Sequence, residues 1–290
     1  MSRFKRTVVL GSSGMLGATV VRFLSKQNVK TLGLSRAQNF NVEDLNSAKI
    51  TLEKLDLRPE DLLVNCIGWI PQKSKGEVSE DATKATIANS LLPALLENIS
   101  KTTGVAVVQI LTDCVFSGNS GPYSESFKPD SGDLYGLSKR LGEVALSRTM
   151  GIRCSIVGLS TNEKASLLDW FLSQPIDCEL QGYTNHLWNG VTTNAFAHLV
   201  FGIFSSGEFA PGIRHWVPLD SVTKFQLLSE VRSLAKRSDI RLVPVKADSA
   251  VDRRLATNFP ENSESLWRLS GYNSVPSVNH LLSDLFLEEL

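Results

Sequence analysis

The sequence predicts an α/β fold: a Rossmann-type doubly wound parallel sheet with a smaller, irregular C-terminal substrate domain. Three observations carry this prediction. Short apolar runs alternate with helical patterns through residues 1–160, as in proteins built from βαβ units. A glycine-rich loop, GSSGMLG, follows the first apolar run. After residue 160 the alternation loosens into aromatic and polar segments rich in turn residues.

The first half of the chain contains the regular elements. Helices that connect parallel strands pack as right-handed crossovers, so strands and helices must alternate. Strands are expected at 7–10, 29–34, 61–68, 105–111 and 153–159. Helices are expected at 15–26, 86–100 and 135–148.

In the second half we expect four helices and one short strand. The helices are placed at 165–174, 195–204, 221–236 (with Ser221 as the N-terminal cap) and 276–290, and the strand at 211–218. The expected domains are a dinucleotide-binding domain at 1–160, completed by part of 191–240, and a substrate-binding region at 161–190 and 241–290.

Composition narrows the class of protein. The 290 residues are 42% apolar and 21% charged, enough to bury a core without disulfides or metals. Lysine plus arginine equals aspartate plus glutamate, 30 against 30, which argues against a nucleic-acid binder. Four scattered cysteines form no CxxC pair and indicate neither a metal site nor a disulfide framework. The longest late apolar stretch, AFAHLVFGIF, is too short to span a membrane. We expect a soluble cytoplasmic protein.

The loop after the first strand has the spacing GxxGxxG, with Gly11, Gly14 and Gly17. Glycine permits the tight turn and the close backbone approach that a bound pyrophosphate needs. The N-terminus of the following helix offers free N–H groups and a positive dipole end. We therefore expect Gly11, Ser13, Gly14, Met15, Leu16 and Gly17 to contact a dinucleotide.

The end of the second strand bears on the choice of dinucleotide. NAD-binding proteins usually place an acidic residue there for the ribose 2′-hydroxyl. Here the residues are Ser35 and Arg36, and we expect no acid nearby. A guanidinium and a hydroxyl suit a 2′-phosphate, so the sequence favours NADP(H) over NAD(H). The alternative is an arginine that only faces solvent.

Three residues suit the reduction of a ketone. Thr112 ends the strand at 105–111, and Tyr135 and Lys139 share a helix face four residues apart. A phenol has a pKa of about 10, and a nearby ammonium is expected to lower it. We expect Tyr135 to donate the proton, Lys139 to tune it and anchor the ribose, and Thr112 to orient the carbonyl. The alternative is a chance surface pair of Tyr135 and Lys139.

The stretches VVLGSSGMLG, LTDCVFSG, PYSE, YGLSKRLGE and, more loosely, GIRHW resemble dTDP-4-dehydrorhamnose reductase and related nucleotide-sugar 4-keto-reductases. This family lies in the extended short-chain dehydrogenase/reductase superfamily. The resemblance covers the first 160 residues well and the remainder thinly. The family pattern S-T-D-Y-V-F-D-G keeps Thr112 and Asp113 here but has Cys114 in place of the tyrosine.

The resemblance implies further contacts with each ligand. For the cofactor these are Asn41, Val42, Cys66, Ile67 and Gly68, together with Tyr135 and Lys139. For the substrate they are Asp113, Cys114 and Asn89.

The stretch YTNHLWNGVTT and the pair Arg253–Arg254 are distinctive. Trp188 offers a flat surface for a base, or is a core residue among turn residues. Arg253 and Arg254 offer a bidentate site for a diphosphate, or are exposed charges. We take Trp188 and Arg253 as substrate-binding.

The resemblance implies an NADPH-dependent reductase of the 4-keto group of a nucleotide-linked deoxysugar, whose product feeds a surface polysaccharide. The expected partner is the nucleotide sugar; a homodimer is compatible with the sequence, and nucleic acid and membrane partners are not expected. Two alternatives stay open. One is an NAD-dependent epimerase or dehydratase of the same superfamily. The other is a non-catalytic, dinucleotide-binding regulatory subunit.

Overall fold

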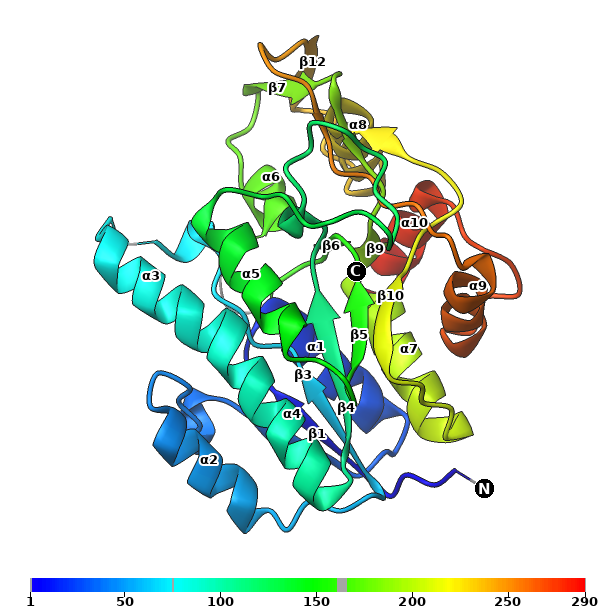
Figure 1. The fold of residues 1–290 in the computed structure, drawn as a ribbon. Helices are drawn as coiled ribbons and strands as arrows, with labels where there is room; N and C mark the ends of the chain where they lie inside the picture. The colour runs from blue at the N-terminus through cyan, green and yellow to red at the C-terminus, as the bar shows by residue number, and fades with distance from the viewer. Residues whose placement is uncertain (1, 75, 161–165, 290) are drawn as a thin grey trace.

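The computed structural model describes residues 2–74, 76–160 and 166–289. Residues 161–165, which include the start of the expected helix at 165–174 and of the expected substrate region, lie outside the described residues. Within the described part, a six-stranded sheet has the order β10-β5-β4-β3-β1-β2 (Figure 1). Every neighbouring pair in it is parallel. The predicted fold class is confirmed.

The bounds of the elements in the first half follow. The strands are β1 (Arg6–Leu10), β2 (Thr31–Leu34), β3 (Asp61–Asn65), β4 (Ala106–Leu111), β5 (Met150–Arg153) and β6 (Ile156–Val157). The helices are α1 (Met15–Lys26), α2 (Leu45–Lys54), α3 (Val78–Thr86), α4 (Leu92–Thr103) and α5 (Leu134–Val144), with a π-helical turn η3 (Ile87–Leu91) joining α3 to α4. Short 3₁₀ turns are η1 (Arg36–Gln38), η2 (Pro71–Lys73) and η4 (Asp113–Val115).

The second half is less regular. Its helices are α6 (Leu167–Leu172), α7 (Thr193–Ser206), α8 (Lys224–Leu234), α9 (Pro260–Leu269) and α10 (Val278–Glu289). Its strands are β7 (Glu179–Tyr183), β8 (His186–Trp188), β9 (Val191–Thr192), β10 (Gly212–His215), β11 (Val222–Thr223), β12 (Arg241–Val245) and β13 (Val251–Asp252).

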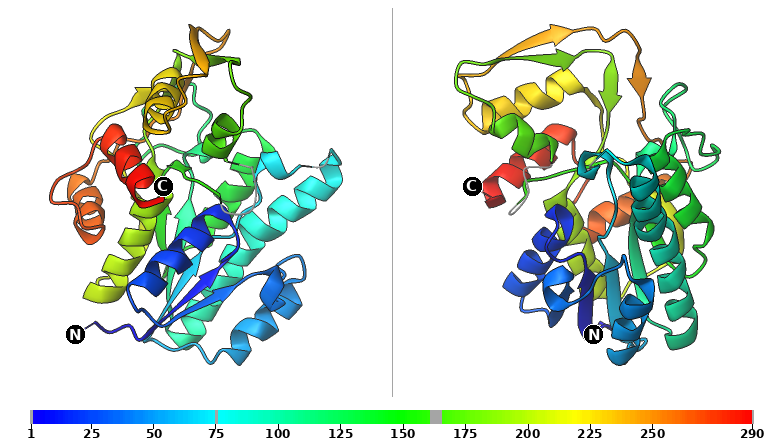
Figure 2. Two further views of the ribbon diagram at one scale, coloured as in Figure 1. Left: turned by 180° about the vertical axis from the view of Figure 1, so that it is seen from behind. Right: turned by 90° about the vertical axis from the view of Figure 1, so that its left-hand side faces the viewer.

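Two apolar layers hold the sheet between helices on both faces (Figure 2). One layer joins the sheet to α1, α7 and α9, and includes Val20, Phe196 and Trp267. The other joins it to α2 and α4, and includes Leu52 and Leu96. The buried strands are continuous apolar runs because both faces of a doubly wound sheet are covered. This covering leaves the two ends of the strands as the places where a ligand can enter.

The chain reverses direction of winding between β1 and β3. From β1 it proceeds outward to β2, then returns to β3 on the other side of β1 and continues to β4 and β5. Ligands of open parallel sheets bind outside the carboxyl ends of the strands at such a point. The loop after β1 and the loop after β3 therefore lie on either side of the expected dinucleotide site.

Helices α6, α8 and α10 lie above this edge of the sheet in Figure 1, and a third apolar cluster lies among them. It is formed by α6, α8 and α10 with β8 and β11, and contains Phe171, Trp188 and Leu227. Small sheets β7–β12 and β11–β8–β13 extend it. We propose that this cluster is the core of the substrate-binding region, whereas α7 and β10 belong with the main sheet.

Three expectations about local structure were wrong. The expected strand at 153–159 is β5 at Met150–Arg153 in the main sheet, followed by β6, which pairs with β9. The expected cap Ser221 is replaced by Thr223, whose hydroxyl accepts the N–H of Gln226 in a capping box. The helix expected at 135–148 ends at Val144. In each case the hydrogen-bonding partners, and not the local residue pattern, decide where the element begins or ends.

Candidate active site

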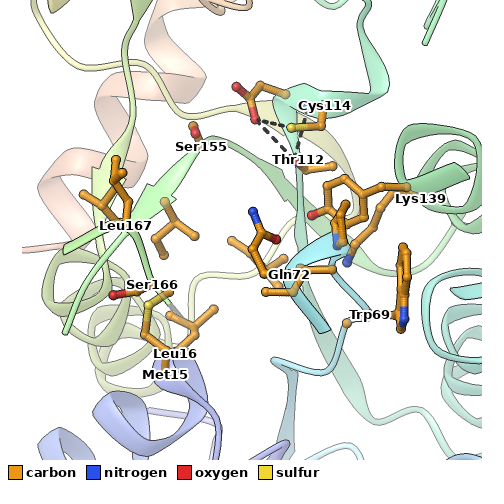
Figure 3. A pocket seen from close by; sticks show the side chains of 18 of the residues that line it. Met15, Leu16, Trp69, Gln72, Thr112, Cys114, Lys139, Ser155, Ser166 and Leu167 are labelled. Atoms are coloured by element: carbon orange, nitrogen blue, oxygen red, sulfur yellow. Dashed lines mark hydrogen bonds between the residues drawn. The ribbon is translucent and has the colours of Figure 1, made fainter. Parts of the chain in front are cut away.

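A cavity of about 850 Å³ lies at the carboxyl edge of the main sheet, between the sheet and the upper cluster. Its walls come from the loops after β1, β3, β4 and β5, from the start of α5, and from the upper cluster. Figure 3 shows Met15 and Leu16 on one side and Thr112, Cys114 and Lys139 on the other. The predicted residues that line it are Gly14, Met15, Leu16, Cys66, Ile67, Gly68, Thr112, Asp113, Cys114, Tyr135, Lys139, Trp188 and Arg253.

The glycine loop has the shape of a phosphate cradle. Gly11 has φ +80°, a conformation that side chains rarely adopt. A Cβ on Gly17 would lie 2.2 Å from the carbonyl oxygen of Gly11, so α1 packs directly on the loop. Gly14 is the N-cap of α1 and supplies no capping side chain. The first turn of α1 thus presents its N–H groups toward the cavity, and the residues fit a bound pyrophosphate.

The end of β2 differs from the expectation. The Ser35 hydroxyl caps the turn η1, accepting from Ala37 N at 3.2 Å, and donates to Gln38 Oε1 at 2.6 Å. The Arg36 guanidinium is exposed and pairs with Glu43 at 2.9 Å. The expectation that no acid lies nearby was therefore wrong. The sequence pattern did not predict the pair with Glu43, because Glu43 lies seven residues after Arg36 and a turn brings the two together.

The neighbouring Asn41 also has a local role. Its side-chain oxygen accepts the N–H of Glu43 at 3.2 Å, which shapes the turn that brings Glu43 to Arg36. Val42 packs at the edge of the second apolar layer. Neither Asn41 nor Val42 is among the residues that line the cavity, nor is Ser13.

Thr112, Tyr135 and Lys139 lie together on the far wall. Thr112 ends β4 and caps the turn η4, where its hydroxyl accepts from Cys114 N at 3.1 Å. Thr112 and Tyr135 both line this part of the cavity. The Lys139 ammonium lies 6.0 Å from the centre of the Tyr135 ring. A hydroxyl, a phenol and an ammonium therefore line the same wall of the cavity.

Burial governs the protonation of this group. Removal from water raises the pKa of the Tyr135 phenol, and the neighbouring Cys114 raises it further. Burial lowers the pKa of Lys139 to about 8, against an opposing effect of Glu143. The expectation that the ammonium lowers the phenol's pKa was therefore wrong, because burial raises that pKa. Tyr135 is held protonated, in the form that donates a proton.

Asn89 was expected to bind substrate, but it lies behind the cavity wall. Its side chain accepts from Trp69 N at 3.0 Å and donates to Trp69 O at 3.1 Å and to Ser138 Oγ at 3.0 Å. These bonds use both ends of its amide. Asn89 therefore fixes the loop after β3 against α5, next to Gly68 and Lys139.

The substrate side of the cavity carries Asp113, Cys114 and Arg253. Burial raises the pKa of Asp113, and burial together with Asp113 raises that of Cys114 to about 12. Arg253 donates from Nε to the carbonyl oxygen of Phe116 at 3.0 Å, and its Nη2 lies 3.9 Å from Asp133. Arg254 instead forks onto Asp252 at 2.8 and 2.7 Å. Only Arg253 of the expected arginine pair lines the cavity.

Trp188 is a core residue that also lines the cavity. Its ring is buried in the upper cluster, its Nε1 donates to Ser155 Oγ at 2.8 Å, and it lines the cavity. Lys224, which the sequence did not single out, lies 5.2 Å from the centre of this ring. Burial lowers the pKa of Lys224, with Asp113 opposing. No local motif marks Lys224, because it is a helix residue brought to the cavity by the packing of α8.

Within the described residues, no group of three or more His, Cys, Asp or Glu side chains is arranged to hold a metal ion. No helix in the same part of the chain has both the length and the apolar character needed to cross a membrane.

The fold and the glycine loop define a Rossmann-like α/β protein. A family model described as the RmlD substrate binding domain matches residues 5–167, and the chain belongs to this family. The resemblance noted from the sequence motifs is thereby confirmed.

Relatives and solved structures agree with this family. A dTDP-4-dehydrorhamnose reductase of Streptomyces griseus is 29% identical over 142 residues, 49% of this chain and 44% of the relative. Methionine adenosyltransferase 2 subunit beta of Xenopus laevis is 24% identical over 148 residues, 49% of this chain and 42% of the relative. The match thus spans less than half the length of each relative.

Two solved structures share the fold along almost the whole chain. A dTDP-4-dehydrorhamnose reductase from Bacillus anthracis in complex with NADP has a TM-score of 0.77 at 16% identity, covering 99% of this chain and 100% of that one. The enzyme of the same name from Yersinia enterocolitica gives the same TM-score, identity and coverage. At these identities the similarity shows the fold.

Proposed function

We propose that this protein is an NADPH-dependent oxidoreductase that reduces the 4-keto group of a nucleotide-linked deoxysugar. The observation that carries the proposal is the meeting of Thr112, Tyr135 and Lys139 in one cavity with the glycine loop. The family and the NADP complex of a structural neighbour support the same reading. We further propose that the protein works in the cytoplasm on a pathway to polysaccharide.

The proposed roles follow from the geometry. NADPH, when bound along the glycine loop, supplies the hydride that the carbonyl carbon accepts. Thr112 donates a hydrogen bond to the carbonyl oxygen and holds it beside Tyr135. Tyr135, protonated because of its burial, transfers its proton to that oxygen, so that a ketone becomes an alcohol. Lys139 carries a positive charge that stabilises the phenolate left behind.

The proposed substrate lies across the cavity from the glycine loop. Arg253 and Lys224 are the cations on that side, and a diphosphate needs positive charge and N–H donors. Trp188 offers an apolar surface at the same end. Ser35 and Arg36 remain our proposed contacts for the 2′-phosphate. Arg36 must first break its ion pair with Glu43 in order to bind that phosphate.

One alternative has a specific observation in its favour. Several relatives carry the name methionine adenosyltransferase 2 subunit beta, which is the name of a subunit. A dinucleotide-binding subunit without turnover is therefore the second candidate. An NAD-dependent epimerase or dehydratase is the third, and the Arg36–Glu43 pair keeps it open.

Titration of the purified protein with NADPH and NADH, followed by turnover with 4-keto nucleotide sugars, tests these readings. We expect tighter binding of NADPH and consumption of it in the presence of substrate. Tyr135→Phe should lower kcat at least a hundredfold, the range of general acid catalysis, and leave NADPH affinity within twofold. Equal rates for Tyr135→Phe and the parent would contradict the mechanism. Binding without turnover on any sugar would favour the dinucleotide-binding subunit. NAD(H) that stays bound through purification would favour the epimerase or dehydratase.

A further inference from the structure

We propose that His215 is a positioning residue that locks segment 253–258, which carries Arg253, onto the end of the main sheet. What Arg253 binds rests on the proposed function; the lock itself does not. His215 ends β10, is fully buried, and does not line the cavity. Its two ring nitrogens contact Ala256 of the segment and Arg153 of β5, and Arg153 in turn pairs with Glu143 of the helix α5.

The partners of His215 determine its tautomer. Arg153 Nη1 lies 2.7 Å from Nε2 of the ring. A guanidinium only donates, so Nε2 is the acceptor and carries no proton. The proton of the neutral ring is therefore on Nδ1, which lies 2.7 Å from the carbonyl oxygen of Ala256. Arginine thus orients the ring so that it donates to the segment.

A buried path leads from this contact to the active site. Arg153, at the end of β5, forks onto Glu143 with Nε–Oε1 at 3.1 Å and Nη2–Oε2 at 2.5 Å. Glu143 lies one helical turn after Lys139 on α5 and favours the charged form of that lysine. Glu143, Arg153 and His215 are all buried. They connect the catalytic helix to Ala256 without passing through the cavity.

A second contact links the same arginine to Arg253. The Arg153 guanidinium lies 5.3 Å from the centre of the Phe116 ring. The carbonyl oxygen of Phe116 accepts from Arg253 Nε at 3.0 Å. Arg153 is therefore packed against the residue that holds Arg253 at the cavity.

Other side chains fasten the segment on both sides of Ala256. Asn189 binds Leu255 twice, donating to its carbonyl oxygen at 2.7 Å and accepting its N–H at 2.8 Å. Glu125 accepts from Thr257 Oγ1 at 2.7 Å and from Asn258 N at 2.9 Å. His215 differs from both because it bonds directly to Arg153 as well as to the segment.

Two polar replacements of His215 each keep a different one of its two contacts, that with Ala256 or that with Arg153. In His215→Asn the side-chain amide nitrogen lies near the position of Nδ1 and can still donate to Ala256. In His215→Gln the longer side chain reaches Arg153 instead. Both remove the ring, and His198→Phe, on α7 and away from the cavity, serves as the control. The measurements are amide hydrogen exchange at 253–258 and the affinities for NADPH, dTDP and UDP.

We expect exchange at Ala256 and its neighbours to rise at least tenfold in His215→Gln and to stay within threefold of the parent in His215→Asn. Affinity for dTDP or UDP should fall at least fivefold in His215→Gln alone, with NADPH affinity unchanged. Equal exchange in the two variants would overturn the lock. A parent protein that binds neither dTDP nor UDP and reduces no sugar would sink the proposed function, while the exchange comparison would still decide on the lock.

Nuclear magnetic resonance of the parent provides a measurement that needs no variant. The ring nitrogens of His215 should show a proton on Nδ1, slow to exchange, and none on Nε2 at pH 7. A proton on Nε2 would contradict the orientation by Arg153 and overturn the proposal.

Discussion

The Lys139 ammonium and Gly68 are in such close contact that a Cβ on Gly68 would lie 2.9 Å from Nζ. The same Cβ would lie 3.4 Å from Asn89 Oδ1. The loop after β3, held by Asn89, therefore forms one side of the space in which Lys139 sits. The absence of a side chain at residue 68 is what permits the ammonium to lie beneath the loop.

Gly68→Ala should displace the ammonium while leaving the fold intact. Only the end of a flexible side chain must move, so we expect a loss of unfolding free energy of about 1 kcal/mol or less. We expect NADPH affinity to fall about tenfold, equivalent to about 1.4 kcal/mol. Calorimetric titration and thermal unfolding check both values. Gly132→Ala is the control, because a Cβ at Gly132 meets nothing within 4 Å; equal affinities for the two variants would contradict this role of Gly68.

Glu43→Gln should raise the affinity for NADPH relative to NADH. It frees Arg36 from its ion pair, and exposed pairs contribute up to about 1 kcal/mol, so a two- to fivefold gain is expected. Fluorescence titration with both dinucleotides measures it. Glu53→Gln breaks the similarly exposed pair with Lys49 and should change neither affinity. A gain for NADH as large as that for NADPH would argue against Arg36 as the 2′-phosphate contact.

The affinity of the free protein for NADPH should fall as the pH rises from 7 to 9. Burial lowers the pKa of Lys139 to about 8, so the ammonium that is proposed to anchor the ribose loses its charge in this range. Titrations at half-unit intervals of pH measure the change. In Lys139→Gln the affinity should be weaker and flat over the same interval. A step of the same size in Lys139→Gln would assign the titration to another group.

His215 should make folding sensitive to mild acid. Burial and the adjacent Arg153 lower its pKa from 6.5 to about 4, with Glu125 opposing. Below pH 6.5 the imidazole of His215 is therefore protonated in the unfolded chain, whereas in the folded protein it stays neutral until the pH falls to about 4. The neutral ring of His215 thus contributes about 3 kcal/mol to the free energy of unfolding above pH 6.5. This contribution is lost as the pH falls toward 4.

Urea unfolding between pH 7 and 4 checks this expectation. In His215→Asn, which has no titrating ring, the loss over this range should be smaller by about the same amount. His198→Phe should retain the slope of the parent. A parent-like slope in His215→Asn would show that Glu125 or another carboxylate accounts for the acid sensitivity.

The order of elements and the loop chemistry could be predicted from local sequence. The helix at 15–26 matches α1 (Met15–Lys26) residue for residue, because its apolar spacing begins directly after Gly14, which is its N-cap. Thr112, Tyr135 and Lys139 were found because strand end and helix spacing fix their positions locally. Strand 153–159 was misplaced because the run starts at the last residue of β5 and continues through β6, and only pairing partners decide where one strand stops.

Contacts between distant segments could not be predicted from the sequence, and the reason is physical. Lys224 at the cavity, Asn89 behind Trp69, and Glu43 beside Arg36 each depend on where a helix or turn packs. The pKa of Tyr135 was expected to be lowered by charge and is raised by burial, and burial is a property of the folded whole. The sequence by itself determined the parallel sheet, the glycine loop and the neighbouring positions of Thr112, Tyr135 and Lys139, since these follow from local periodicity and spacing. Only the tertiary structure decided which cations meet in the cavity and how His215 holds segment 253–258, because such contacts join residues far apart in the chain.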